Sequence, residues 1–290
     1  MREFKDQILF ITGSTDGLGK KVAIDLAKQG ATVLLHGRSP EKGKAVLHEI
    51  EAASGSRKSR YYNADLSSLD AVRRLADEIR ANHARIDVLI NNAGVGPGAP
   101  GEGRRLSADG YELHFAVNYL SHFLLTRQLL PLMLKSAPAR IINVSSAGQH
   151  PIDFENLMLE RNYDDLRAYR QSKLAQIMFT IDLAEELKDS GVTVNCLHPA
   201  SLMNTNMTAR TRYFSAPLAT VEQGAEALEY VAASPELEKV TGEYFNGKQR
   251  SKANAQAYDQ EARRRLRELS WQIAGLAEGP GIKAALRKSA

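Results

Sequence analysis

Short apolar runs alternate along the chain with longer stretches in which apolar residues recur every three or four positions. The apolar runs predict strands at 7–12, 31–36, 60–63, 88–91, 140–145, 193–197 and 242–245. The longer stretches predict helices at 18–29, 40–53, 69–83, 107–135, 166–189, 221–233 and 262–269. Such alternation is typical of a parallel sheet covered by helices on both faces, so we expect a doubly wound, Rossmann-like α/β fold of about seven strands.

Three segments interrupt this alternation, at 94–103, 149–165 and 204–218. The first is dense in glycine and proline, which is typical of a loop. Each segment follows the carboxyl end of a predicted strand, the edge at which open α/β sheets bind ligands. We therefore expect the three segments to form the mouth of a binding site.

The pattern fits a single domain over residues 1–273, followed by a tail at 274–290 that we expect to be mobile. The chain has 290 residues, of which 43% are hydrophobic and 25% charged, which excludes disorder as its main state. The net charge of +4 is too small to predict a nucleic-acid partner. No apolar run is long enough for a signal peptide or a membrane span, so we expect a cytoplasmic protein.

A glycine-rich loop at residues 12–19, with the sequence TGSTDGLG, links the first predicted strand to the first helix. Glycine lets the backbone approach a phosphate closely, and the N-terminus of the following helix attracts an anion. This position between a strand and a helix predicts a dinucleotide site. The candidate cofactor contacts in the loop are Gly13, Ser14, Thr15, Asp16, Gly17, Leu18 and Gly19.

The second predicted strand ends in the sequence HGR, and no acidic residue follows before Glu41. A carboxylate at this point would bind the ribose hydroxyl of NAD, whereas a basic residue favours the additional phosphate of NADP. Arg38 offers a forked, charge-assisted contact to phosphate, so the sequence favours NADP(H) over NAD(H). Asp16 in the glycine loop weighs against a nearby phosphate, and a solvated loop arginine is the alternative interpretation of Arg38.

Tyr169 and Lys173 lie four residues apart on a predicted helix and therefore share one of its faces. The pKa of a free tyrosine is too high for a base near neutrality, and a nearby ammonium group lowers it. The pair is a candidate proton donor and acceptor for a carbonyl and alcohol couple. The strand at 140–145 leads into Ser145 and Ser146, either of which can hydrogen-bond a substrate oxygen.

Together these motifs resemble the short-chain dehydrogenase/reductase family, in its single-domain branch. Residues 12–19 match its T-G-x-x-x-G-x-G loop, residues 91–94 its N-N-A-G and residues 169–173 its Y-x-x-x-K. The resemblance covers roughly residues 5–247. Residues 115–122 and the pair 198–199 further resemble the retinol-dehydrogenase-like group, whose members typically oxidise or reduce apolar alcohols and carbonyls with NADP(H).

The resemblance implies a set of catalytic roles. Tyr169 is the acid/base, and Lys173 lowers the pKa of Tyr169 and binds the nicotinamide ribose. Ser146 rather than Ser145 polarises the substrate oxygen, because the family's serine usually stands last in this pair. Asn118 positions a water molecule that links Lys173 to solvent.

The resemblance also implies cofactor contacts beyond the glycine loop, at Asp65, Leu66, Asn92, Ala93, Gly94, Pro199 and Thr205. The chain departs from the family at Ala200, where a glycine is usual, and Thr205 lies one residue later than usual. The long interval between Ser146 and Tyr169 recurs in the retinol-dehydrogenase-like group and is expected to reshape the substrate mouth. Candidate substrate contacts there are Ser146, His150, Tyr213 and Phe214.

Other features have simpler interpretations. His114, Asn118 and His122 share a helical face, but no further residue at a recognisable spacing completes a metal-ligand set, so we expect no metal. The single cysteine, Cys196, is expected to be a core residue and excludes an intrachain disulfide. The basic run of the last helix predicts a solvated face, with an acidic partner as the alternative; it consists of Arg263, Arg264, Arg265 and Arg267.

The stretch at 123–134 is apolar nearly all round a helix and must be buried. In the family that the chain resembles, the equivalent helix often packs against a second subunit. We therefore expect a homodimer, with burial inside the monomer as the alternative.

We expect an NADP(H)-dependent oxidoreductase that interconverts a carbonyl and an alcohol on a small apolar substrate. One alternative is an NADP(H)-binding regulator or scaffold without turnover, although such a protein needs no acid/base pair. A second alternative is an epimerase or dehydratase from the larger branch of the same fold. The sequence does not identify the substrate or the direction of the reaction.

Overall fold

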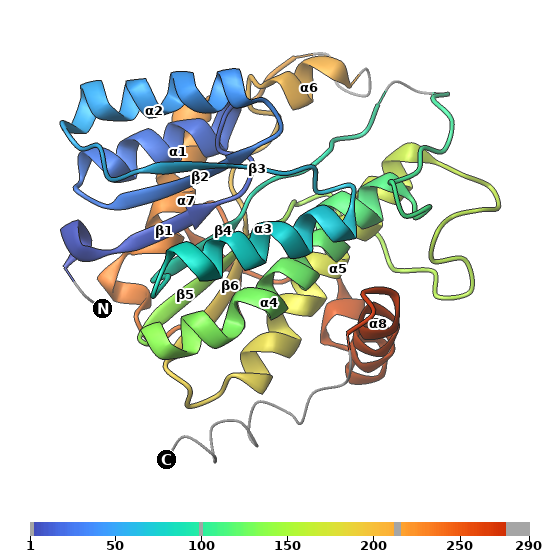
Figure 1. Ribbon diagram of the computed structural model, residues 1–290. Coiled ribbons are helices and arrows are strands. Elements are labelled where there is room, and N and C mark those ends of the chain that lie inside the picture. Colours follow the sequence, from blue (N-terminus) through green and yellow to red (C-terminus); the bar gives the residue numbers. More distant parts are fainter. Residues whose placement is uncertain (1–2, 99–100, 212–215, 277–290) are drawn as a thin grey trace.

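A sheet with helices on both faces forms the centre of the molecule (Figure 1). The computed structural model describes residues 3–98, 101–211 and 216–276. Its eight strands are β1 Ile8–Ile11, β2 Thr32–Gly37, β3 Arg60–Asn63, β4 Val88–Asn91, β5 Ala139–Val144, β6 Val192–His198, β7 Tyr244–Asn246 and β8 Gln249–Ser251. All seven predicted strands are confirmed. The pattern missed β8, which has three exposed residues and no apolar periodicity.

The strand order is β3-β2-β1-β4-β5-β6-β7-β8, and all neighbours are parallel except β7 and β8. From β1 the chain continues first to β2 and β3 on one side and then to β4 on the other. The direction of the strand order therefore reverses between β1 and β4, the point at which such sheets open a ligand-binding crevice. The glycine loop follows β1 and the 91–94 motif follows β4, so both lie at this crevice.

The α-helices are α1 Gly17–Lys28, α2 Pro40–Ser54, α3 Leu69–Asn82, α4 Ser121–Ser136, α5 Asp165–Glu186, α6 Asn206–Arg210, α7 Val221–Ala233 and α8 Gln260–Ile273. Shorter helices are η1 Phe4–Asp6, the π-helix η2 Phe115–Leu120, η3 Pro235–Leu237 and η4 Ala255–Tyr258. The predicted helical start at 107 is wrong, because Ser107 N–H bonds to Tyr111 O in a turn and helix begins only at 113. The short α6 lies in a segment predicted as loop.

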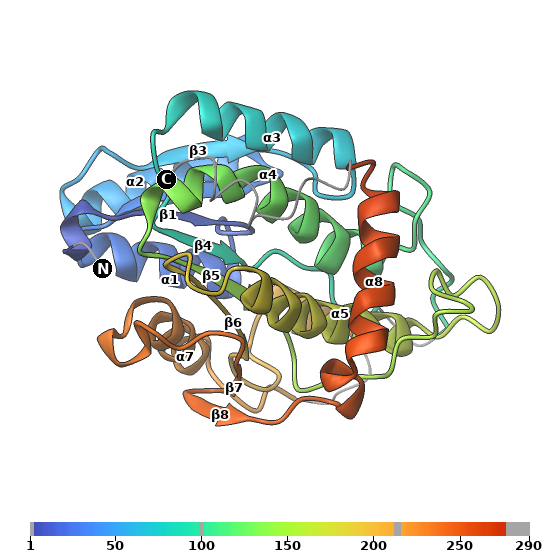
Figure 2. The ribbon, with the colours of Figure 1, turned by 90° about the horizontal axis from the view of Figure 1, so that it is seen from below.

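The sheet separates two hydrophobic cores, and alternate side chains of each strand enter opposite cores. Leu9 and Ile11 of β1 pack with residues of α1, α2 and α7, whereas Phe10 joins the core formed with α3, α4 and α5. Figure 2 shows α3, α4 and α5 on one side of the sheet and α1 and α7 on the other. The predicted two-faced covering of the sheet is confirmed.

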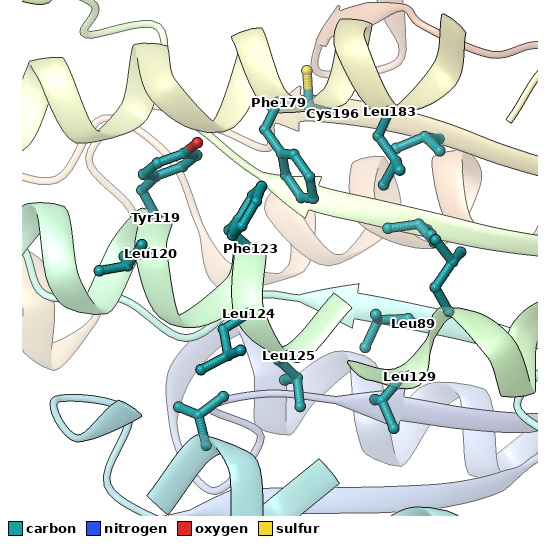
Figure 3. Packing of buried hydrophobic residues seen from close by; sticks show 14 of the residues in the cluster. Leu89, Tyr119, Leu120, Phe123, Leu124, Leu125, Leu129, Phe179, Leu183 and Cys196 are labelled. Carbon is teal, nitrogen blue, oxygen red and sulfur yellow. The ribbon is translucent and has the colours of Figure 1, made fainter. Parts of the chain in front are cut away.

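The apolar helix α4 is buried within the single chain. The Phe123 side chain is 1% exposed, and its ring lies 5.2 Å from the Phe179 ring of α5 (Figure 3). The same ring lies 5.8 Å from the Trp271 ring of α8. Burial inside the monomer therefore accounts for the apolar pattern that led us to expect a homodimer.

The basic run of α8 is not a free solvated face. Arg263 is 5% exposed and its Nη2 lies 2.7 Å from Glu185 Oε1, while Arg267 Nη1 lies 2.6 Å from Asp182 Oδ2. Both acids belong to α5, so the acidic partner is in the same chain and the solvated-face prediction is wrong for Arg263. These pairs fasten α8 across α5.

The first residue of the expected tail, Ala274, packs against the domain. Ala274 is fully buried, and its carbonyl oxygen accepts a hydrogen bond from Arg73 Nη2 at 2.6 Å. Residues 277–290 lie outside the described part of the chain. Within the described residues, no helix is both long and apolar enough to cross a membrane.

Candidate functional site

The glycine loop packs directly against the turn that follows β4. Gly13 has a φ of +64°, and a Cβ placed on it would lie 2.8 Å from Ala93 Cα. A Cβ on Gly19 would lie 2.4 Å from the carbonyl oxygen of Gly13. Only glycine fits at both positions, because the atoms that a side chain would meet are backbone.

His36 of β2 fixes the glycine loop, a role that sequence reasoning missed. The Gly13 N–H donates to His36 Nδ1 at 3.1 Å, and His36 Nε2 lies 3.2 Å from the carbonyl oxygen of Ala64. A carbonyl can only accept, so Nε2 carries the proton. Burial lowers the pKa of His36 to about 4, which keeps the ring neutral near pH 7. The ring therefore joins the loop to the end of β3.

A second neutral histidine connects both turns of the crevice to α4. Thr12 Oγ1 accepts hydrogen bonds from the N–H groups of Asn92 and Ala93, at 2.9 and 3.0 Å, and lies 3.1 Å from His122 Nε2. The other ring nitrogen of His122 lies 3.1 Å from the carbonyl oxygen of Asn118. Burial lowers the pKa of His122 to about 3, so the ring is neutral near pH 7.

The histidine spacing on this helix does not assemble metal ligands. His114 and His122 bond to separate partners, one to Glu112 and the other to Thr12. In the part of the chain that the structure describes, no group of three or more histidine, cysteine, aspartate or glutamate side chains is placed to hold a metal ion. Cys196 is fully buried, and burial raises the pKa of its thiol to about 12, as suits a core residue.

Two cations lie beside the glycine loop. Arg38 directly follows β2, is exposed, and makes no hydrogen bond or ion pair with another described residue. Lys42 Nζ lies 2.8 Å from Asp16 Oδ2, which also accepts from Asn206 Nδ2 at 2.8 Å. The Lys42 bond is the main cause that holds the pKa of Asp16 below its usual value. The charge of Asp16 is therefore paired, whereas that of Arg38 is available to a ligand.

The hydroxyls of Ser146 and Tyr169 meet at the carboxyl end of β5. The Ser146 hydroxyl accepts from the Gly148 N–H at 3.0 Å and lies near enough to the Tyr169 hydroxyl to lower the pKa of that group. Ser145 Oγ instead donates to the carbonyl oxygen of Lys173 at 2.8 Å. Of the two serines, the structure brings Ser146 to Tyr169 and turns Ser145 toward the α5 backbone.

Burial shifts the pKa values of Tyr169 and Lys173 in opposite directions. It raises the pKa of Tyr169 against the effect of the Ser146 hydrogen bond, and it lowers the pKa of Lys173 to about 7. Lys173 Nζ donates to Val144 O and to Gln176 Oε1, both at 2.9 Å, and lies 5.8 Å from the centre of the Tyr169 ring. Burial is the largest cause of the raised Tyr169 pKa, and the lowering that we expected from Lys173 stays a prediction.

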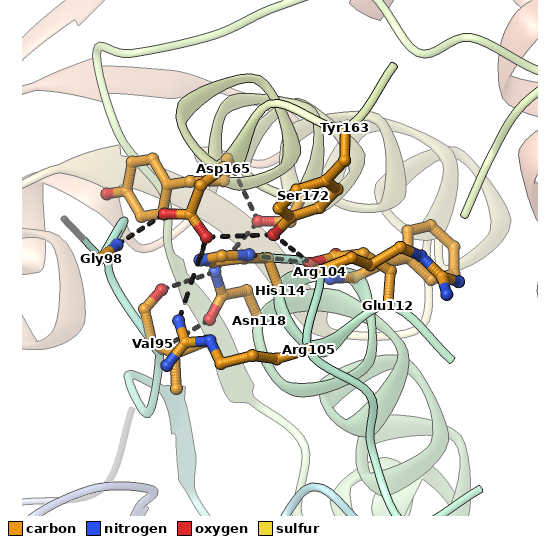
Figure 4. Close-up of polar contacts among 12 residues, drawn as sticks. Val95, Gly98, Arg104, Arg105, Glu112, His114, Asn118, Tyr163, Asp165 and Ser172 are labelled. Atoms are coloured by element: carbon orange, nitrogen blue, oxygen red, sulfur yellow. Dashed lines mark hydrogen bonds and ion pairs between the residues drawn. The ribbon is translucent and has the colours of Figure 1, made fainter. Parts of the chain in front are cut away.

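Asn118 lies in the π-helix η2, an irregularity that is frequent at functional sites. Its Oδ1 accepts from the Val95 N–H at 2.7 Å, and its Nδ2 donates to Val95 O and to Ser172 Oγ, both at 3.0 Å (Figure 4). The side-chain amide thus ties the segment after β4 to α5. No direct contact to Lys173 is among these bonds.

The short helix α6 lies against both turns of the crevice. Thr205 caps α6, and its methyl group would lie 3.4 Å from a Cβ on Gly17. Met207 approaches the loop after β4 so closely that a Cβ on Gly96 would lie 2.5 Å from its Cγ. Met207 is 38% exposed, and sequence reasoning missed it because no motif marks the segment.

The other predicted contacts differ in exposure and in hydrogen-bond partners. Asp65 is exposed after β3 and accepts from the Ser67 N–H at 2.9 Å, whereas the Leu66 side chain is buried. Pro199 is buried directly after β6. His150 Nδ1 lies 2.8 Å from the carbonyl oxygen of Pro151. The candidate contacts Tyr213 and Phe214 lie outside the described residues.

Comparison with known proteins gives consistent matches. The family profile described as short chain dehydrogenase matches residues 7–215. Mouse retinol dehydrogenase 13 is 38% identical over 94% of this chain and 85% of its own length, and human retinol dehydrogenase 11 is 38% identical over 93% and 86%.

Solved structures agree with the sequence matches. A short chain dehydrogenase from Shigella flexneri complexed with NADP has a TM-score of 0.68 and 28% identity, covering 84% of this chain and 98% of that one. One from Escherichia coli complexed with NADPH has a TM-score of 0.69 and 28% identity, covering 84% and 97%. The chain therefore belongs to the short-chain dehydrogenase family, in its retinol-dehydrogenase-like group, and is an oxidoreductase that acts on alcohol or carbonyl groups with a nicotinamide cofactor.

Proposed function

We propose that the protein is an NADP(H)-dependent oxidoreductase that interconverts a carbonyl and an alcohol on a small apolar substrate. The observation that carries this proposal is the approach of the Ser146 and Tyr169 hydroxyls to one another beside Lys173. Two hydroxyl groups that meet at one point can both bond a single substrate oxygen. The raised pKa of Tyr169 keeps its phenol protonated near neutrality, which is the form that donates a proton during carbonyl reduction.

The crevice fits a dinucleotide. The glycine loop has no room for side chains at Gly13 and Gly19, so backbone lines the site. Asp16 caps the N–H of Gly17, and no other described group bonds to the next two N–H groups of α1, at Leu18 and Gly19. Unpaired N–H groups at a helix N-terminus suit a diphosphate.

We propose that Arg38 binds the adenosine end of the cofactor, with Lys42 as a second cation. Lys173 binds the nicotinamide ribose. When bound, the cofactor supplies or accepts the hydride. Tyr169 transfers the proton to or from the substrate oxygen, and Ser146 stabilises the charge that develops there. A Lys173 pKa near 7 favours proton exchange with solvent, through a water molecule that we assign to Asn118.

The substrate class is inferred from the relatives and from the mouth of the site. The relatives named above are retinol dehydrogenases, whose substrate is a long apolar alcohol. Met207, which is partly exposed next to the loop after β4, offers an apolar contact at the mouth. Retinaldehyde and other apolar aldehydes are therefore the first substrates to test.

The cofactor assignment predicts the behaviour of Arg38→Asp. The exchange should lower kcat/KM for NADPH by about 10- to 100-fold, since hydrogen bonds between charged groups are worth about 1.5–3 kcal/mol. It should change kcat/KM for NADH far less, because NADH lacks the extra phosphate. Both values are measured by NADPH and NADH consumption with a panel of apolar aldehydes.

Arg74→Asp is the matched control, because Arg74 is also exposed and also lacks a hydrogen bond or ion pair to any described residue. This exchange alters the net charge by the same amount as Arg38→Asp and should leave the preference for NADPH over NADH unchanged. A wild-type preference for NADH, or an unchanged preference in Arg38→Asp, would overturn the cofactor assignment.

A further inference from the structure

Three ionisable side chains are buried next to Tyr169 without a part in the reaction described above. Glu112, His114 and Asp165 are 1%, 0% and 2% exposed. Figure 4 shows them gathered with Tyr163 and Arg105, where the start of α5 meets the segment that leads into η2. A buried charge raises the free energy of the folded state unless it is paired. The pairing of these three side chains is therefore important for the fold.

The two ring nitrogens of His114 both have hydrogen-bond partners. Its Nδ1 lies 2.8 Å from Glu112 Oε1, and its Nε2 lies 3.1 Å from the carbonyl oxygen of Gly96. The carbonyl can only accept, so Nε2 carries a proton. Glu112 Oε2 also accepts from the Phe115 N–H at 2.8 Å, so the carboxyl group of Glu112 is fixed at both of its oxygens. The His114 ring is therefore held from both sides.

The same residues fasten both loops of the substrate mouth. Asp165 Oδ2 accepts a hydrogen bond from the Gly98 N–H, and its Oδ1 lies 3.0 Å from the Tyr163 hydroxyl and 4.0 Å from Arg105 Nη2. The Tyr163 hydroxyl also lies 3.3 Å from Glu112 Oε1. Tyr163 belongs to the predicted segment 149–165 and Gly98 to the segment 94–103, so the cluster joins the two.

His114 also contacts the catalytic tyrosine. The ring centres of His114 and Tyr169 are 6.3 Å apart with an interplanar angle of 83°, an edge-to-face arrangement. Asp165 lies four residues before Tyr169 on α5, and its Oδ1 lies 3.9 Å from His114 Nε2. The Tyr169 hydroxyl thus lies near Ser146, and its ring packs against His114.

We propose that His114, held between Glu112 and the carbonyl of Gly96, is a positioning residue that holds the ring of Tyr169 in its reactive orientation. Glu112 and Asp165 fix His114 in place, and the cluster joins both loops of the mouth to the catalytic helix. This inference rests on the proposed function, because His114 acts through Tyr169.

Kinetics of His114→Gln, Glu112→Gln and the double variant test the positioning role. Each single change should lower kcat about 10- to 100-fold, since small misplacements of catalytic groups have effects of this size. The dissociation constant for NADPH should stay within about twofold of the wild-type value. We express kcat per NADPH-binding site, so that a loss of folded protein does not lower the measured kcat. The double variant should be no worse than the worse single variant, because residues that act as a unit are not additive.

His48→Gln is the matched control and should keep the wild-type kcat, because His48 is exposed on α2. Unchanged kcat per binding site in His114→Gln, or additive losses in the double variant, would overturn the positioning role while the proposed function stands. A wild-type protein that turns over no carbonyl would overturn the proposed function and the positioning role together.

The anchoring of His114 is tested without turnover, and without any variant that needs to be active. Nitrogen-15 NMR of the full chain with labelled histidine should show the His114 imidazole protonated at Nε2, because that atom donates to the carbonyl oxygen of Gly96. Substitution His114→Gln identifies the signal by its loss. A wild-type spectrum in which the Nε2 atom of this imidazole carries no proton would overturn the inference.

Discussion

Replacing Tyr169 with phenylalanine is expected to lower kcat for carbonyl reduction about 1000-fold or more, since general acid catalysis contributes factors of about 100 to 10,000. The exchange removes only the hydroxyl that lies beside Ser146 and keeps the ring that packs against His114. Ser146 does not replace the lost donor, because an aliphatic hydroxyl is a much weaker acid than a phenol. NADPH consumption at saturating aldehyde measures the loss, and fluorescence titration should show an NADPH dissociation constant within about twofold of wild type.

Tyr230→Phe provides the control for this prediction. Tyr230 lies on α7, where its hydroxyl donates to Glu236 Oε2 at 3.0 Å, away from the crevice. The same atom is removed there, and kcat should not change. If Tyr169→Phe kept more than about a tenth of the wild-type kcat, Tyr169 would not be the proton donor.

Gly19→Ala is expected to weaken NADPH binding about 100-fold or more. A methyl group on Gly19 would lie 2.4 Å from the carbonyl oxygen of Gly13 and 2.5 Å from Asn92 Nδ2. Asn92 Nδ2 is itself bonded to the carbonyl oxygens of Thr12 and Gly13, at 2.8 and 3.1 Å, so the glycine loop and the turn after β4 must move apart. Helix propensity alone would predict the opposite, because alanine stabilises a helix by about 1 kcal/mol relative to glycine.

The variant Gly17→Ala tests the effect of backbone strain without the steric displacement of the loop that Gly19→Ala causes. Gly17 has a φ of +50°, but among the described residues a Cβ there would meet only Thr205, at 3.4 Å from its Cγ2 and 3.6 Å from its Cβ. The cost is the strain of a left-handed alanine, about 1–2 kcal/mol, and NADPH binding should weaken about 10-fold. Isothermal titration with NADPH compares the two variants, and circular dichroism verifies their folding. Equal affinities for Gly19→Ala and wild type would show that the loop does not need its present packing.

Most of the fold followed from local pattern. Alternation of apolar runs is a property of neighbouring residues, so seven strands and the faces of the sheet could be predicted. The helix predicted from 107 began too early because the turn at Ser107 depends on a backbone bond to Tyr111, which apolar spacing does not reveal. The exposed strand β8 was not predicted, because it pairs with a neighbour at one edge only and has no side chain in the core.

Site residues that belong to a sequence motif could be predicted. Contacts between residues that are distant in the sequence could not. Tyr169, Lys173 and Ser146 stand in recognisable patterns. Thr12 and His122 are 110 residues apart, and no local pattern predicts their contact. The same reason applies to the ion pairs of α8: Arg263 looked solvated because its partner Glu185 is 78 residues away.

Transfer of deuterium tests the central claim most directly. The enzyme is supplied with NADPH that carries two deuterium atoms at the reactive carbon of its nicotinamide ring, together with an apolar aldehyde such as retinaldehyde. We predict that the alcohol product carries a single deuterium on its carbinol carbon and that one NADPH is consumed for each alcohol formed, as mass spectrometry and absorbance will show. A product without deuterium, or turnover without net consumption of NADPH, would contradict hydride transfer and with it the proposed function.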